Sequence, residues 1–142
     1  MVRCSFGCFS THPCACTLPP SSDANLIEGL GEFTPTPILV VQGTADPLVP
    51  YAGGETRSAI GSAETLAKLN GSTQHRHLDF DGFSYDDFTG GEPVRLVTMK
   101  DHGHMVPVDK QLDARLGPSS TATTGVKLLT DFLADVADAR TR

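Results

Sequence analysis

Residues Pro37 to Pro50 read PILVVQGTADPLVP and contain the strongest fold signal of the chain. Ile38 to Val41 form a continuous apolar run, which is typical of a strand buried on both faces of a parallel sheet. The run stops at Gly43, and a carboxylate, Asp46, follows in a loop rich in glycine and proline. In open α/β sheets, ligands bind beyond the carboxyl ends of the strands. The stretch therefore predicts a buried strand that presents an acid at the functional edge of a sheet.

A second strand is predicted over Val94 to Met99, and the loop after it contains HGHMVP, from His102 to Pro107. An acid and a histidine, each in the loop after a strand, are two of the three parts of a hydrolase triad. Asp46 would hold the tautomer of a histidine, and His104 would transfer protons. His102 is the second candidate for the histidine. In the alternative reading, Asp46 only closes a turn, as Asp-Pro pairs commonly do.

The rest of the pattern alternates strands and helices, which indicates the α/β class. The further predicted elements are a helix from Ser62 to Leu69, a strand from His75 to Phe80, a turn-rich polar loop from Asp81 to Gly91 and a helix from Thr124 to Ala139. One apolar stripe is predicted along the last helix, formed by Val126, Leu129, Leu133 and Val136. Two or three parallel strands alone would leave an edge of the sheet exposed. We therefore expect a mainly parallel sheet that is part of a larger one.

The third part of a triad, a nucleophilic serine in an elbow, is not found. Glycine stands two positions before Ser84 (GFSYD) and before Ser119 (GPSST), but neither motif has the closing glycine of G-x-S-x-G. Neither serine follows a buried strand, so both are interpreted as loop residues.

Other polar clusters have plainer interpretations. His75 and His77 stand at strand spacing and could share a metal, but an exposed edge strand explains them equally well. Asp81, Asp86 and Asp87 are interpreted as a solvated acidic loop. No cofactor and no metal site is predicted.

Residues 1–34 are interpreted as an irregular leader rich in Cys, Pro and Ser, and residues 35–142 as the domain. The leader holds all the cysteines, Cys4, Cys8, Cys14 and Cys16. With His12 they could form a zinc site, or they could form local disulfides, but they lack paired C-x2-C spacing. Polar residues interrupt the apolar start, so no signal peptide is predicted and the compartment is not determined.

Composition excludes several partners. The chain has 142 residues, a net charge of −6 and a pI near 5.2. Nucleic acids and anionic membranes are held by clustered Lys and Arg, so neither is expected as a partner. No apolar run is long enough to span a bilayer. The sequence does not determine the oligomeric state.

Four blocks, VVQGTADPLVPYAGG, SAETLAKLNG, VRLVTMKDHGHMVP and TDFLADV, occur in this order. In this respect the chain resembles the carboxyl-terminal part of the polyhydroxybutyrate depolymerase and feruloyl esterase group of α/β-hydrolases, over about residues 35 to 137. That group shows HGTADxxVPY, a helix ending in LNG, and a strand leading into GGHxWP. HGHMVP is also similar to GHMVP of serine carboxypeptidases, but the upstream block fits the esterases better.

The resemblance implies roles for single residues. Asp46 matches the catalytic acid of the group, and His104 matches its catalytic histidine. His102 stands where the group usually has glycine. Gln42 replaces the usual histidine of HGTAD, and Met105–Val106 replaces x-Trp. These replacements are expected to affect packing around the acid and the histidine.

The implied fold is a partial α/β-hydrolase fold, and the implied protein is a serine esterase of a usually secreted family. The expected substrate is a small-molecule or polymeric ester. The half that carries the serine and the oxyanion loop is expected to lie outside this sequence, so enzymatic activity of this chain is uncertain. The alternatives are a non-catalytic truncated remnant, a partner-binding fragment and, last, a small metal-binding module built on the cysteines.

Overall fold

The computed structural model describes residues 33–54, 57–110 and 112–141. The cysteine cluster with His12 lies outside these residues. The elements are β1 (Ile38–Gly43), α2 (Ala59–Leu69), β2 (Gln74–Phe80), β3 (Phe83–Thr89), β4 (Val94–Met99), the short 3-10 helix η1 (Ala114–Leu116) and α3 (Gly125–Arg140). The predictions of β1 and β4 are confirmed, and β2 is one residue longer than predicted.

The four strands form one sheet in the order β1-β4-β3-β2. β1 and β4 are parallel, with Val40 opposite Leu96. β3 runs antiparallel to β4 on one side and to β2 on the other. The α/β class is thus confirmed, but the prediction of a mainly parallel sheet is wrong. Among the described strands, only β1 and β4 run parallel, and the sheet is mixed.

The β2–β3 hairpin accounts for this difference. The polar segment from Asp81 to Gly91 was expected to be a loop, but most of it forms β3. Asp81-Gly82 connects the two strands, and Gly82 has a positive φ of +80°. An Asp-Gly pair between two strands is a strong hairpin signal because such turns require positive φ. Here the turn chemistry outweighs the polar composition that suggested a loop.

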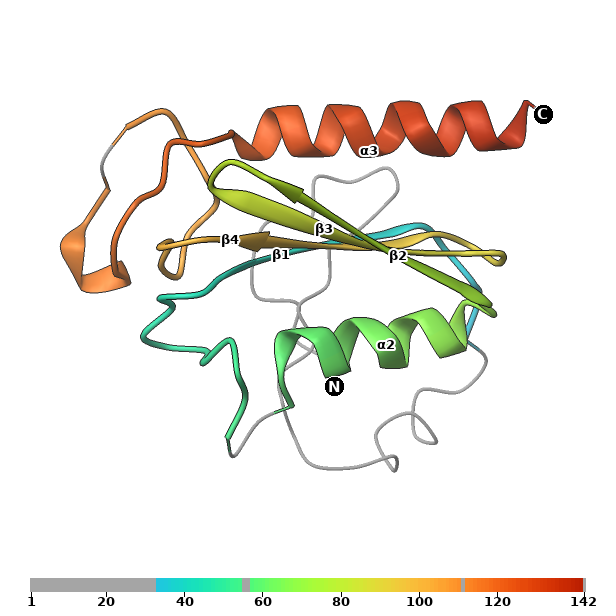
Figure 1. Ribbon diagram of the computed structural model, residues 1–142, viewed down its shortest axis with the longest axis horizontal. Helices are drawn as coiled ribbons and strands as arrows, with labels where there is room; N and C mark the ends of the chain where they lie inside the picture. The colour runs from blue at the N-terminus through green and yellow to red at the C-terminus, as the bar shows by residue number, and fades with distance from the viewer. Residues whose placement is uncertain (1–32, 55–56, 111, 142) are drawn as a thin grey trace.

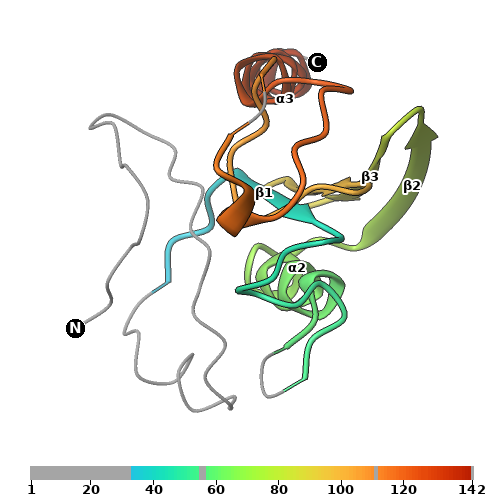
Figure 2. The same cartoon turned by 90° about the vertical axis from the view of Figure 1, so that its left-hand side faces the viewer.

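The two long helices cover opposite faces of the sheet (Figure 1). On one face, α2 packs Ala63, Leu66 and Ala67 against Ile38, Val40, Phe88, Val94 and Leu96. On the other face, α3 packs Leu128 and Phe132 against Leu39, Tyr85, Val97 and Met99. A view along the layers shows the sheet between the helices (Figure 2). β4 is buried along its whole length because both layers cover it.

A capping residue directly precedes each of the two long helices. α2 begins at Ala59, three residues before the predicted start at Ser62, because Ser58 Oγ accepts the Gly61 N–H at 3.2 Å. In α3 the hydroxyl of Thr124 accepts the Lys127 N–H at 3.3 Å.

No helix in the described part of the chain has the length and apolar character that crossing a bilayer would need.

The apolar stripe predicted for α3 is on the wrong side of the helix. Val126 is 78% exposed, Leu129 43% and Leu133 41%, and of the predicted stripe only Val136 packs partly against the core. The sheet instead covers Leu128 and Phe132, which are four residues apart. Two apolar stripes compete on this helix, and the position of the helix over the sheet selects one of them.

The acidic residues of β3 are not solvated as predicted, because Asp86 and Asp87 are both buried. Asp87 is paired with the buried guanidinium of Arg95, whose Nη2 lies 3.0 Å from Asp87 Oδ2. Arg95 also binds Asp135 of α3 at 2.9 Å. Burial opposes ionisation, but the bonds to Asp87 and Asp135 outweigh it and raise the pKa of Arg95. This network ties α3 to the sheet.

Candidate active site

Asp46 lies in the loop that follows β1, and four donors hold its carboxylate. Oδ1 accepts the backbone N–H groups of Leu48 and Val49, both at 2.8 Å. Oδ2 accepts Gln42 Nε2 at 2.9 Å and His104 Nδ1 at 2.8 Å. The side chain is only 3% exposed. The carboxylate is therefore buried and fixed, with one oxygen directed at the histidine.

His104 lies in the loop that follows β4, the strand parallel to β1. Its backbone N–H donates to Leu116 O at 2.6 Å, and the adjacent Gly103 N–H donates to Pro118 O at 2.7 Å. The imidazole is 29% exposed, so solvent or a small molecule can reach it while Asp46 stays covered. The parallel pairing of β1 and β4 brings the two loops to the same edge of the sheet.

The contact between the two side chains sets the protonation of both. A carboxylate can only accept, so Nδ1 of His104 carries the proton and Nε2 is the basic nitrogen. Burial works against ionisation of Asp46, but the hydrogen bonds from Val49, His104 and Leu48 outweigh it and lower the pKa of Asp46. An ionised acid that orients a histidine in this way has the same relative arrangement as the acid and the histidine of a hydrolase triad.

Close backbone packing holds together the loop after β1, the loop after β4 and the segment at η1. A Cβ on Gly103 would fall 2.0 Å from Leu116 O, and one on Gly43 would fall 2.0 Å from His102 O. The Ala45 N–H donates to His102 O at 3.0 Å. Glycine is needed where backbones approach this closely, so these positions fix the distance between the acid and the histidine.

His102, the second candidate for the histidine, has a structural role. It is fully buried, at 1% exposure. Its Nδ1 accepts the Ser120 N–H at 2.9 Å, so Nε2 carries the proton and donates to Met105 O at 3.0 Å. Both ring nitrogens bind backbone, and neither is placed for proton transfer. His102 instead braces the loop that carries His104.

Neither Ser84 nor Ser119 lies in a nucleophile elbow. Ser84 is a buried residue of β3, paired in register with Thr98. Ser119 follows η1 and is closer to the site, since its Oγ lies 3.1 Å from the sulfur of Met105 and accepts the Leu112 N–H at 3.2 Å. Neither is at a strand–turn–helix junction, which is the structure that exposes a nucleophile in this class of fold.

The structure brings His75 and His77 of β2 together on one carboxylate. His75 Nε2 and His77 Nδ1 each lie 2.9 Å from Asp86 Oδ1. The bond to Asp86, with its charge, raises the pKa of His77. In the described part of the chain, no three His, Cys, Asp or Glu side chains are arranged to hold a metal ion. We interpret this cluster as two histidines that provide hydrogen-bond partners for the buried carboxylate of Asp86.

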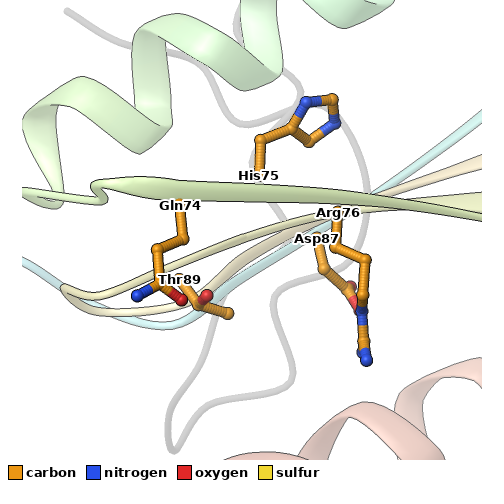
Figure 3. A pocket seen from close by; sticks show the side chains of 5 residues that line it. All are labelled: Gln74, His75, Arg76, Asp87 and Thr89. Carbon is orange, nitrogen blue, oxygen red and sulfur yellow. The ribbon is translucent and has the colours of Figure 1, made fainter.

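A shallow hollow lies on the β2–β3 hairpin, lined by Gln74, His75, Arg76, Asp87 and Thr89. Figure 3 shows Arg76 and Asp87 directed to the α3 side of the sheet and His75 to the opposite side. Asp87 is already bound by Arg76, whose Nη2 lies 3.2 Å from Asp87 Oδ2. None of the lining residues comes from the loops that hold Asp46 and His104, so the hollow is separate from that pair.

Sequence reasoning identified Asp46 and His104, and the structure places them in contact. Sequence reasoning did not reveal the role of Gln42, which was expected to affect packing only. The amide of Gln42 donates to Asp46 Oδ2 and, at 3.0 Å, to Val49 O. No local pattern marks this role, because it depends on the path of the loop between the two residues.

Comparison with known proteins gives a match to a family model. A family model described as TAP-like protein, of the α/β-hydrolase class, matches residues 7–78. The matched range includes β1, Asp46, α2 and most of β2, and it ends before β4 and His104. No curated protein matches significantly, and no solved structure does.

Proposed function

Because the chain belongs to the TAP-like protein family of α/β-hydrolases, we propose that it supplies the acid and the general base of a serine-type carboxylic ester hydrolase. The observation that carries this proposal is the 2.8 Å contact between His104 Nδ1 and Asp46 Oδ2 at the carboxyl ends of two parallel strands. The lowered pKa of Asp46 supports its role, since the acid must be ionised to orient the histidine.

The two residues have distinct tasks in this mechanism. His104 Nε2 takes the proton of the attacking hydroxyl and later returns it to the leaving alcohol. Asp46 keeps the proton on Nδ1 and stabilises the imidazolium that forms during attack. Acyl transfer to a serine gives an acyl-enzyme, which water then hydrolyses through the same histidine. The nucleophile and the oxyanion donors come from outside the described residues.

The substrate class rests on the sequence blocks shared with polyhydroxybutyrate depolymerases and feruloyl esterases. These blocks include TADPLVPY around Asp46 and the approach to His104. A small-molecule or polymeric carboxylic ester is therefore the proposed substrate. The second reading is a non-catalytic remnant or partner-binding fragment, and it is favoured by the absence of an elbow serine among the described residues.

Hydrolysis of p-nitrophenyl acetate by the purified 142-residue chain and its His104→Ala variant tests the proposal. We expect the wild-type rate to exceed that of the variant by about a hundredfold or more, the lower end of the range for a positioned general base. His77→Ala is the matched control, because His77 also binds a carboxylate but lies on β2. This control should hydrolyse the ester at the wild-type rate.

Labelling with a fluorophosphonate then locates the nucleophile. A label that attaches to the chain and is lost in Ser119→Ala or Ser84→Ala would place the serine on a described residue. A label that persists in both variants would place it elsewhere in the chain. Equal ester hydrolysis by wild type and His104→Ala would overturn the proposal for this chain and support the non-catalytic reading.

A further inference from the structure

Gln42 stands at the end of β1, opposite Thr98 of β4, where the strand gives way to the loop of the acid. The side chain reaches across this loop. Its Nε2 donates one hydrogen bond to Asp46 Oδ2 at 2.9 Å and a second to the carbonyl oxygen of Val49 at 3.0 Å. One amide group thus binds both the carboxylate and the backbone of the loop that carries it.

The donors around Asp46 divide between its two oxygens. The backbone N–H groups of Leu48 and Val49 hold Oδ1, and they belong to the same turn as the acid. Oδ2 accepts hydrogen bonds from His104 and from Gln42. A carboxylate has about four lone-pair sites, so these four donors saturate it. Gln42 is the only one of the four that comes from a strand of the sheet.

We propose that Gln42 is a positioning residue that fixes the rotation of the Asp46 carboxylate toward His104. The inference rests on the proposed function, because the orientation of the acid matters only if His104 transfers protons. An uncharged amide suits this task, since it donates over the whole range of pH in which a hydrolase works. β1 holds the backbone of Gln42, and the Gln42 amide in turn holds the Asp46 carboxylate through a hydrogen bond.

A purely structural role would have a different signature. If Gln42 only closed the loop through Val49, its loss would lower stability but leave the bond between Asp46 and His104 intact. If it positions the carboxylate, its loss must change that bond itself. The two roles are therefore separated by spectroscopy on the acid and the histidine rather than by stability alone.

Proton NMR of the full chain measures this bond. The Nδ1–H proton of His104 is assigned by its disappearance in His104→Ala. In Gln42→Met, which keeps the size but cannot donate, we expect this proton to exchange with water about tenfold faster, as loss of a bond to a charged group implies. We also expect the pKa of Asp46, followed by its carboxyl carbon, to rise because the charged form loses a donor.

Thr44→Val is the matched control. It removes a 3.0 Å hydrogen bond from the Asp101 N–H to Thr44 Oγ1. Thr44 lies in the same loop as Asp46, but this hydrogen bond does not involve the Asp46 carboxylate. It should leave both signals unchanged. Should Gln42→Met fail to fold, Gln42→Asn keeps an amide but shortens its reach, and it should show the same two changes.

The outcomes separate the two proposals. Unchanged proton exchange and an unchanged Asp46 titration in a folded Gln42 variant would overturn the positioning role alone. Absence of any His104-dependent proton in the wild type would show that the acid and histidine are not bonded, and the proposed function would then fail with it.

Discussion

Gly43 packs directly against the main chain of His102, so that a Cβ built on it would fall 2.0 Å from the His102 carbonyl oxygen and 2.5 Å from its carbonyl carbon. Both contacts are backbone atoms, which cannot move aside cheaply. Gly43→Ala should therefore push the loops of Asp46 and His104 apart. We expect this variant to lower the free energy of unfolding by about 2 kcal/mol, as overpacking does. Urea unfolding followed by circular dichroism is the measurement.

Gly61→Ala, within α2, is the control for this change. Its Cβ would meet only side-chain atoms of Arg57 and Ser58 at 3.1 Å or more. Alanine also favours a helix over glycine, so this variant should be neutral or slightly more stable. Equal stability of the Gly43 variant and the wild type would show that the loops are not packed as described.

Replacement of His102 by alanine tests its role as a brace. The variant leaves the Ser120 N–H and the Met105 carbonyl without their partner in a buried site. We expect a loss of about 3 kcal/mol in the free energy of unfolding, since each buried unsatisfied group is costly. His75→Ala on the exposed strand β2 should cost less. A His102 variant as stable as the His75 variant would contradict the assignment.

The ion pair of Asp87 and Arg95 should be far more sensitive than the one between Arg95 and Asp135. Asp87→Asn leaves a buried guanidinium without its main countercharge, which costs about 3–5 kcal/mol in comparable pairs. Asp135 is 61% exposed, so Asp135→Asn should cost about 1 kcal/mol or less. Thermal and urea unfolding of the two variants measure the difference, and similar losses would mean that Arg95 is more solvated than described.

Two adjacent leucines of α3 should respond in opposite ways. Leu128 lies in the core and Leu129 on the exposed side. Leu128→Ala should lower the free energy of unfolding by about 2–5 kcal/mol through lost burial and a cavity, whereas Leu129→Ala should cost about 1 kcal/mol or less. Urea unfolding of both variants is the measurement. A larger loss for Leu129 would mean that the other stripe of the helix faces the core.

Acid should selectively weaken the contribution of Asp46. Its pKa in the folded protein is lowered from the ordinary value of 3.8. The group therefore stabilises the fold fully above 3.8, and this stabilisation is lost as the pH falls through the lower folded value. The difference in unfolding free energy between wild type and Asp46→Asn should shrink as the pH falls from neutral to about 3. A constant difference would contradict the lowered pKa, and Asp79→Asn is the control for an exposed carboxylate.

Local sequence was sufficient for the parts of the fold that one segment specifies by itself. Val94 to Met99 was recognised as a strand because a run of apolar residues has one favourable environment, between two layers. Asp46 and His104 were predicted to lie near one another because each follows such a strand, and ligands of open α/β sheets bind beyond the carboxyl ends of the strands. β3 itself was not predicted, because the polar residues after Asp81-Gly82 indicated a loop rather than the second strand of a hairpin.

Local sequence was enough to predict β1, β2 and β4, the α/β class, and the acid and the histidine that follow β1 and β4. Only the folded chain reveals which apolar stripe of α3 is buried, that Asp86 and Asp87 lie inside, and that Gln42 joins His104 as a donor to Asp46 Oδ2. This difference follows from the range of the interactions along the chain. A strand or a cap depends on neighbours along the chain, whereas the burial of a charge or the choice between two apolar faces depends on partners far away in sequence.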